Sequence, residues 1–134
     1  MGSLTVYLYR VGRNLNRAYR TCEAFGVQDL KLVDCDAKLA GHLYGAAGRV
    51  RVAEAAFLED AGTLALETWA GPPLSAIDWH AVSSVLIGGE TAGLPRGMFR
   101  RAQFTGRIPT VGHVSGLTVE AALAIALYAW RQSC

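Results

Sequence analysis

The segment at residues 83–87 constrains the fold of this chain most, because it is apolar at Val85, Leu86 and Ile87 without any polar alternation. A strand with no polar face must be covered on both faces, and such strands are typical of parallel sheets flanked by helices. Shorter runs of β-formers alternate with helical patterns along the rest of the chain. The sequence therefore predicts an α/β fold with a mostly parallel six-stranded sheet and helices on both faces.

The expected elements follow this alternation in order. We expect strands at residues 4–9, 30–33, 49–53, 63–68, 83–87 and 104–108. We expect helices at residues 14–25, 37–47 and 117–132, a helical turn at 55–58, and short helices near Ala76 and after Pro95. Asn14 is placed to cap the first helix and Gly26 to end it. A length of 134 residues fits a single domain.

Composition and cysteine usage exclude several classes of protein. With 51% hydrophobic residues the chain can bury a substantial core, which excludes an intrinsically disordered protein. We expect no membrane span and no signal peptide, because every apolar run is too short and the N-terminus lacks the required pattern. Cys22, Cys35 and Cys134 and three scattered histidines show no metal-ligand spacing, so we expect no metal site. The odd number of cysteines fits a reducing compartment, and we expect a cytoplasmic protein.

The basic residues are unusual in kind rather than in number. Eleven of the thirteen are arginines, and Arg10, Arg13, Arg17 and Arg20 lie in the first twenty residues with no acidic residue among them. Arginine binds phosphate in a planar, bidentate way that lysine cannot copy. Such a stripe is either a phosphate-binding surface or a solvated helix face, and the pattern alone leaves both open.

The loop after the central strand, at residues 88–95, has the sequence Gly-Gly-Glu-Thr-Ala-Gly-Leu-Pro. It lacks the Gly-Lys-Ser/Thr of a P-loop, and its glycines are not spaced as in a dinucleotide-binding fingerprint. Ligands of parallel sheets bind at the carboxyl ends of the strands, so this loop and the one after Ile108 lie where a cofactor is expected. A tight turn with Glu90 as a capping residue is the alternative.

Three segments in order carry a more specific pattern. The first has Asn14 six residues before an Arg-Thr pair, followed by Ala-Phe-Gly at residues 24–26. The second is the Gly-x-Glu-x-x-Gly-Leu-Pro of residues 88–95, and the third runs from Ile108-Pro109 through Gly112 and Leu117. In order and spacing they resemble the three motifs of the SpoU (TrmH-type) RNA 2′-O-ribose methyltransferases of the SPOUT superfamily.

The resemblance runs through nearly the whole chain. It implies an S-adenosylmethionine-dependent enzyme that methylates a ribose 2′-hydroxyl of a tRNA or rRNA, with a deep C-terminal trefoil knot that holds the cofactor. It implies one methyltransferase domain, residues 1–134, with no appended RNA-binding domain. It also implies a homodimer, for which the helix expected at residues 117–132 offers the apolar side chains of Leu123, Ile125, Leu127, Tyr128 and Trp130.

The resemblance also implies roles for individual residues. Arg20 would bind an RNA phosphate and steady the developing alkoxide, and Glu90 would orient Arg20 or the substrate. The residues implied in catalysis are Asn14, Arg20, Glu90, Ser115 and Thr118. The residues implied at the cofactor are Leu66, Thr68, Gly88, Gly89, Ile108 and Leu117. The residues expected to bind RNA are Arg13, Arg17, Arg96 and Arg100.

The third motif departs from the family pattern. Most relatives have Ser-Leu-Asn where this chain has Gly116-Leu117-Thr118, so that Ser115 stands one residue early and Thr118 offers a hydroxyl in place of an amide. Arg17 stands where small residues are common in the first motif. Two alternatives therefore stay open: a relative that binds RNA or the cofactor without methyl transfer, and a methyltransferase that acts on a base.

Overall fold

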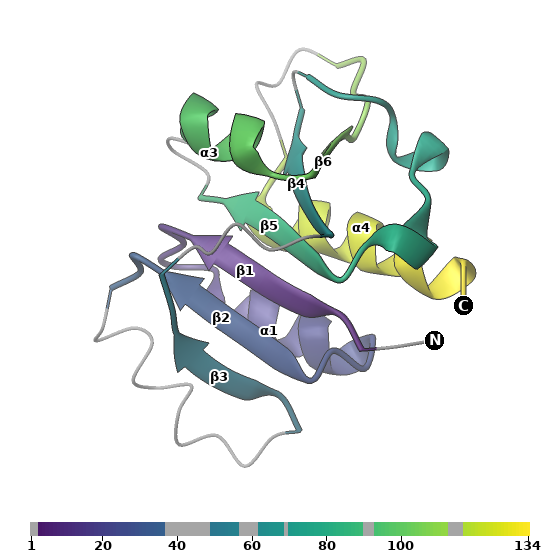
Figure 1. Cartoon of the computed structure of the whole chain (residues 1–134). Helices are drawn as coiled ribbons and strands as arrows, with labels where there is room; N and C mark the ends of the chain where they lie inside the picture. The colour runs from purple at the N-terminus through teal and green to yellow at the C-terminus, as the bar shows by residue number, and fades with distance from the viewer. Residues whose placement is uncertain (1–2, 37–48, 57–61, 69, 90–92, 113–116) are drawn as a thin grey trace.

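The strands form one sheet in which every described pair of neighbours is parallel. The structure is a computed structural model, and it describes residues 3–36, 49–56, 62–68, 70–89, 93–112 and 117–134. The order across the sheet is β3-β2-β1-β5-β4-β6 (Figure 1). The strands are β1 (Thr5–Tyr9), β2 (Asp29–Val33), β3 (Arg51–Glu54), β4 (Thr63–Glu67), β5 (Ser84–Gly88) and β6 (Phe104–Arg107).

Strand β5 lies inside the sheet, between β1 and β4, and is buried on both faces. Val85 and Leu86 are fully buried, although successive side chains of a strand point to opposite faces. The two-sided burial expected of this segment is therefore confirmed for residues 84–87, whereas Ser83 is exposed. The parallel α/β sheet is confirmed as well, and each strand begins and ends within two residues of its expected position.

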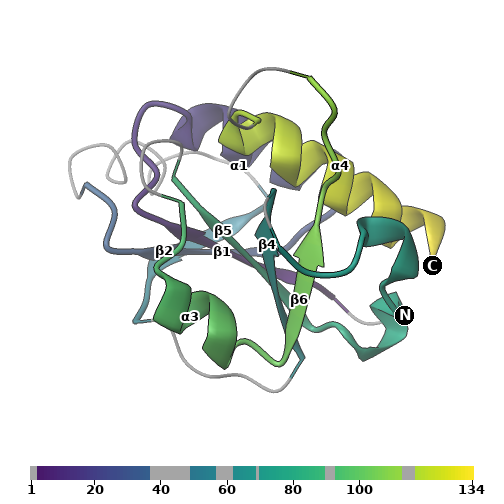
Figure 2. The same cartoon turned by 90° about the horizontal axis from the view of Figure 1, so that it is seen from above.

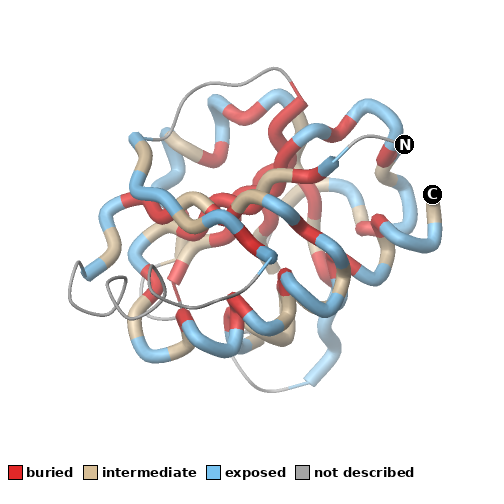
Figure 3. Tube along the Cα trace, turned by 90° about the horizontal axis from the view of Figure 1, so that it is seen from below, coloured by how far each residue is buried: buried red, intermediate tan, exposed pale blue. Residues whose placement is uncertain are grey.

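Helices cover the two faces of the sheet unequally. Helices α1 (Leu15–Ala24) and α4 (Val119–Gln132) pack together on one face, and the shorter α3 (Arg96–Arg101) lies on the other (Figure 2). The main core lies between the sheet and helices α1 and α4. The smaller core packs Tyr7 and Leu86 with Phe99 of α3. In Figure 3 the buried positions gather in the strands and recur at intervals along the helices. The expected helices on both faces are confirmed.

Helix α1 forms where the sequence predicts it, but its N-terminus is held differently. Ala18 and Cys22 are fully buried one turn apart, and Phe25 packs against the same core, so the apolar stripe faces the sheet. Gly26 follows the helix with a φ of 77°, as expected of a C-terminal stop. Asn14 occupies the N-cap position, but its side chain makes no capping hydrogen bond. The capping role expected of Asn14 is therefore wrong.

The predictions for the shorter helical elements are confirmed only in part. A helical turn near Ala76 is confirmed as a 3₁₀ helix at Leu74–Ala76, and Pro95 precedes α3 as expected. No helix begins at Ala55, because its N–H instead donates to the carbonyl of Leu32 at 2.9 Å and prolongs the pairing of β3 with β2. The rest of the turn expected at 55–58 and the helix expected at 37–47 lie outside the described residues, apart from Ala56, which is not helical.

The C-terminal elements cross from the sheet to the helical layer. Strand β6 pairs with β4 at the edge of the sheet, whereas α4 packs against α1 on its face. This arrangement is consistent with the knot that the family resemblance implies, while the threading itself stays a prediction. No helix in the described ranges combines the length and apolarity that a membrane crossing requires.

Cys22 gives the core a measurable pH dependence. Burial raises the pKa of the Cys22 thiol from 9.0 to about 12. Between these pH values the unfolded chain loses the thiol proton while the folded chain keeps it, so the free energy of unfolding falls by about 1.4 kcal/mol per pH unit. Below pH 9 this contribution is constant. We expect denaturant titrations below and above pH 9 to show this fall in the free energy of unfolding. In Cys22→Ala the contribution of the thiol should be absent. The same dependence of the free energy of unfolding on pH in the variant contradicts the assignment.

Candidate functional site

The carboxyl ends of β4, β5 and β6 meet at one edge of the sheet, because these strands are parallel neighbours. Leu66 is in register with Ile87 on one side and with Gly106 on the other. Just beyond β6, the Ile108 N–H donates to the carbonyl of Glu67 at 3.3 Å. Five of the six residues expected at the cofactor therefore lie at or just beyond these strand ends: Leu66, Thr68, Gly88, Gly89 and Ile108. The sixth, Leu117, is partly buried against the main core just before α4.

The described parts of the glycine-rich loop, residues 88–89 and 93–95, form main-chain contacts with the end of β1 and with each other. The Gly89 N–H donates to the carbonyl of Tyr9 and the Gly93 N–H to the carbonyl of Gly89, both at 2.8 Å. A Cβ on Gly88 would overlap the main chain of Gly93, and one on Gly89 would overlap the carbonyl oxygen of Arg10. The absence of a side chain at the described glycines thus allows close main-chain packing within the protein, as the tight-turn interpretation requires. That turn also sets the shape of the edge at which a cofactor is expected.

Glu67 is a charged residue at this edge that the sequence analysis missed. It ends β4, and its Oε1 accepts a hydrogen bond of 2.8 Å from the Leu94 N–H. A Cβ on Gly93, whose φ is 63°, would lie 2.9 Å from the same oxygen. The carboxylate therefore ties the far end of the glycine-rich loop to β4. A lone acidic residue at the end of a buried strand, between Leu66 and Thr68, was the available signal.

Helix α1 displays the residues expected from the first motif. Asn14 is half-buried at the start of the helix, while Arg13 and Arg20 are exposed. Neither arginine forms an ion pair with a described residue. These two guanidinium groups are therefore available to a phosphate on the side of the sheet that α1 covers.

Arg17, also expected to bind RNA, forms an ion pair within the protein. Its Nη1 lies 3.2 Å from Oε1 of Glu120 in the first turn of α4. The Arg17 side chain is 72% exposed and that of Glu120 is 21% exposed. The other carboxylate oxygen of Glu120, Oε2, is buried without a hydrogen-bond partner in the part of the chain that the structure describes. The sequence analysis missed Glu120, whose only signal was an acidic residue just after the third motif.

The remaining arginines expected to bind RNA lie on the opposite face of the sheet. Arg96 begins α3 and Arg100 lies in its last turn, and both are exposed. Because α3 and α1 cover opposite faces, one straight strand of RNA cannot lie along both helices of a single protomer (Figure 2). The structure thus divides the expected RNA-binding arginines into two groups on opposite faces of the sheet.

Arg10 and Asp34 form a second charged feature at the ends of adjacent strands. Each has a φ of 52°, in the left-handed region that non-glycine residues rarely adopt. Nε of Arg10 lies 2.6 Å from Oδ2 of Asp34, and the guanidinium lies 5.4 Å from the centroid of the Tyr9 ring. The hydrogen bond that Arg10 donates to Asp34 raises the pKa of Arg10, so this guanidinium remains charged. Both side chains are 60% exposed, which leaves the pair worth little to stability.

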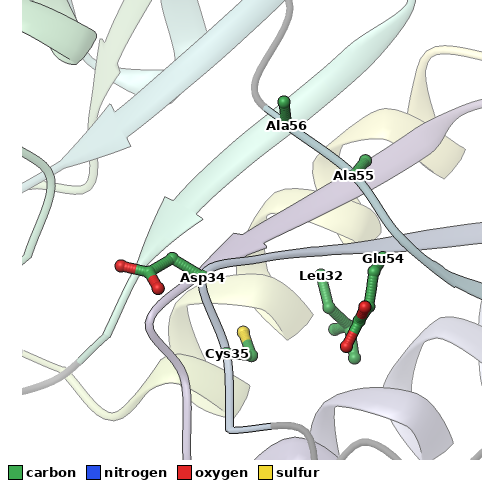
Figure 4. Close-up of a pocket in the computed structure, with 6 residues that line it drawn as sticks. All are labelled: Leu32, Asp34, Cys35, Glu54, Ala55 and Ala56. Atoms are coloured by element: carbon green, nitrogen blue, oxygen red, sulfur yellow. The ribbon is translucent and has the colours of Figure 1, made fainter.

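A pocket of about 420 Å³ lies beside this pair, at the ends of β2 and β3 (Figure 4). Its walls carry two carboxylates, which suits neither a phosphate nor a carboxylate ligand. Burial raises the pKa of the Cys35 thiol, which donates to the carbonyl of Leu8 at 3.4 Å and is therefore neutral. None of the residues expected at the active site or the cofactor lines it; the lining residues are Leu32, Asp34, Cys35, Glu54, Ala55 and Ala56.

The other expected catalytic residues are placed only in part. Thr118 is exposed at the N-cap of α4, and its hydroxyl makes no capping hydrogen bond. Glu90 and Ser115 lie outside the described residues. Within the described ranges, no group of three or more histidine, cysteine or acidic side chains could hold a metal ion.

Comparison with known proteins is consistent with this geometry. The model of the SpoU rRNA methylase family matches residues 3–128. No curated protein sequence matches the chain.

Three solved structures share the fold. An rRNA methyltransferase from Sinorhizobium meliloti with bound AdoMet (S-adenosylmethionine) has 26% identity and a TM-score of 0.80, over 98% of this chain and 56% of its own. The SpoU methyltransferase AviRb from Streptomyces viridochromogenes, in complex with AdoMet, has 21% identity and a TM-score of 0.81, over 97% and 57%. A structure concerned with the 2-OH methylation of C/U34 on tRNA has 24% identity and a TM-score of 0.79, over 99% and 92%. This chain thus spans little more than half of the first two proteins and nearly all of the third.

Proposed function

This chain belongs to the SpoU rRNA methylase family, and on that premise we propose that it is an S-adenosylmethionine-dependent methyltransferase acting on a ribose 2′-hydroxyl of a tRNA or rRNA. One observation supports the proposal most. The strand ends that carry Leu66, Gly88 and Ile108 form one edge of the sheet, and α1 starts from that same edge with Arg20 exposed. Cofactor and RNA could therefore meet there.

The residues at this edge fit the proposed cofactor. Leu66 and Ile108 are buried aliphatic side chains that can cover an adenine ring, and the neighbouring main chain offers N–H and carbonyl groups for its edge. The carboxylate of Glu67 adds negative charge, which suits a positively charged sulfonium. When bound, S-adenosylmethionine supplies the electrophilic methyl group. Both related proteins crystallised with it share this fold.

The protein's own contribution is to bind the RNA and stabilise the reacting oxygen. A guanidinium is already protonated and has no lone pair with which to accept the proton of a hydroxyl, so it does not act as the base here. We assign Arg20 to an RNA phosphate and to the negative charge that develops on the 2′-oxygen. Asn14 lies six residues before it, at the N-cap of α1, and would orient the ribose, while Glu90, Ser115 and Thr118 complete the expected set. Arg13 just before α1, and Arg96 and Arg100 on α3, would add contacts to the RNA backbone.

A non-catalytic relative that binds RNA or the cofactor is the second candidate. Gly116 and Thr118 replace the serine and asparagine of the usual third motif. The guanidinium of Arg17 also forms an ion pair with Glu120. Methylation of a base is a further variant of the enzymatic proposal.

One experiment separates these three functions. The protein is incubated with methyl-labelled S-adenosylmethionine and total RNA, and the RNA is hydrolysed with alkali. A 2′-O-methyl group blocks cleavage at its own nucleotide, so ribose methylation leaves the label in alkali-resistant dinucleotides. Label in mononucleotides would mean base methylation. Calorimetric binding of S-adenosylmethionine without transfer to any RNA would support the non-catalytic relative.

We further propose that the chain forms a homodimer through α4. The structure corrects the surface expected for it: Leu123, Leu127 and Trp130 are buried in the protomer's own core. Ile125 and Tyr128 remain 42% and 58% exposed, one turn apart on the same helix. An apolar pair of this kind on a surface helix suits a self-complementary interface.

Disrupting this pair should change the mass of the protein in solution. We expect Ile125→Glu with Tyr128→Glu to convert a dimer into a monomer in sedimentation experiments, because four carboxylates would meet across the two-fold axis. Val111→Glu is the matched control, since Val111 is fully exposed and lies outside α4. A dimer that survives the double substitution would place the interface elsewhere.

A further inference from the structure

Two segments that carry motif residues are joined by an ion pair that spans most of the chain. Arg17 and Glu120 are 103 residues apart in sequence and 3.2 Å apart between Nη1 and Oε1. Arg17 lies about one turn before Arg20 on α1. Glu120 lies two residues after Thr118, at the start of α4. The pair therefore links the segment that displays Arg20 to the segment that displays Thr118.

Stability does not account for this pair. Arg17 is mostly exposed, and ion pairs with an exposed partner contribute little to the free energy of folding. The second carboxylate oxygen of Glu120 is buried without a partner among the described residues, which is unfavourable. A charged group kept in a place that costs stability is a mark of a functional site.

Each residue lies in or beside a segment that departs from the family pattern. Arg17 replaces a small residue of the first motif, and Glu120 follows a third motif that lacks its usual serine and asparagine. We propose that Glu120 and Arg17 are positioning residues, which hold α1 against the start of α4 and so fix the distance between Arg20 and Thr118. Arg17 then acts through Glu120 and not as a contact to RNA. This inference rests on the proposed methyl transfer and specifies how the segments that carry Arg20 and Thr118 are aligned.

A double-mutant cycle on the intact protein tests the pairing. The variants are Glu120→Gln, Arg17→Ala and the double variant, each assayed for methyl transfer, thermal midpoint and the salt dependence of RNA binding. We expect each single variant to lower kcat about tenfold with KM for RNA within about twofold, because a misaligned site loses rate rather than affinity. The double variant should be no worse than the singles, because they remove the same interaction. The thermal midpoint of Glu120→Gln should not fall.

The exposed Arg51–Asp29 pair on β3 and β2 serves as the matched control. Asp29→Asn removes one carboxylate charge from an ion pair outside the site and should leave kcat unchanged. Arg17→Ala should also leave the salt dependence of RNA binding unchanged, whereas the loss of one phosphate contact would lower its slope by about 0.7.

Two results would overturn the inference. A lower thermal midpoint in Glu120→Gln with unchanged kcat would make the pair merely structural. A higher KM and a shallower salt slope in Arg17→Ala alone would make Arg17 an RNA contact.

If the wild-type protein methylates no RNA, the proposed function fails, and the cycle is then measured in the affinity for S-adenosylmethionine. A coupled loss of affinity in the single variants supports the alignment, and independent or absent effects overturn it.

Discussion

Arg20→Ala is expected to lower the rate of methyl transfer by about 10²–10³-fold, the usual effect of removing one preorganised donor from a charge that develops in the transition state. Arg20 is exposed on α1 and has no ion-pair partner among the described residues, so the substitution removes little else. The measurement is single-turnover transfer from labelled S-adenosylmethionine to an RNA that the wild-type protein methylates.

Several controls separate this effect from misfolding or lost cofactor. Calorimetry should show unchanged affinity for S-adenosylmethionine, because Arg20 lies on a helix and not at the ends of β4, β5 and β6. Arg20→Lys should recover only part of the rate, since an ammonium lacks the planar fork of the guanidinium. Arg13→Ala removes an arginine from the loop just before α1 and should weaken RNA binding with a smaller effect on rate. Full activity in Arg20→Ala would remove Arg20 from the catalytic set.

Gly88→Ala is expected to lower methyl transfer about 10²-fold and to lower the free energy of unfolding by about 1–3 kcal/mol. An added Cβ would lie 2.6 Å from the carbonyl oxygen of Gly93 and 2.7 Å from the nitrogen of Leu94. These are main-chain atoms, so the glycine-rich loop must move as a whole. That movement would break the hydrogen bond from Leu94 to Glu67 and displace the edge where the cofactor is expected.

Gly97→Ala provides the matched control in the same region. A Cβ on Gly97 would meet nothing within 4 Å, and the residue lies within α3. Alanine there should leave activity intact and raise the free energy of unfolding by about 0.4–1 kcal/mol, because it reduces the freedom of the unfolded chain. Thermal denaturation and S-adenosylmethionine binding should therefore separate the two variants. Equal behaviour of both would show that the close packing around Gly88 has no functional role.

Local patterns in the sequence were sufficient for most of the fold. The apolar residues Val85, Leu86 and Ile87, together with the alternation of strands and helices along the chain, predicted a central strand of a parallel sheet. Ala18, Cys22 and Gly26 predicted the buried face and the end of α1 in the same way. Where a local pattern failed, a long-range contact had replaced it: Ala55 extends the pairing of β3 instead of starting a helical turn.

The candidate site was predictable only as far as its strand ends. Gly88 and Ile108 lie in the ordered motifs and Leu66 was implied by the family resemblance; parallel pairing brings all three to one edge. Glu67 escaped notice, because its role depends on the N–H of Leu94, 27 residues away. Thr118 was named, but its relation to α1 depends on how α4 packs.

The sequence by itself determined the parallel sheet, the family and the glycine-rich loop, since each depends on neighbours along the chain. Only the tertiary structure decided which charges meet: Arg17 with Glu120, and Arg10 with Asp34. It also showed that Leu123, Leu127 and Trp130 belong to the protomer's own core and left Ile125 and Tyr128 outside. The physical reason is the same in each case. Periodicity fixes which face of an element is apolar, whereas the partner of a charge or an apolar face is chosen by packing between segments that are distant in sequence.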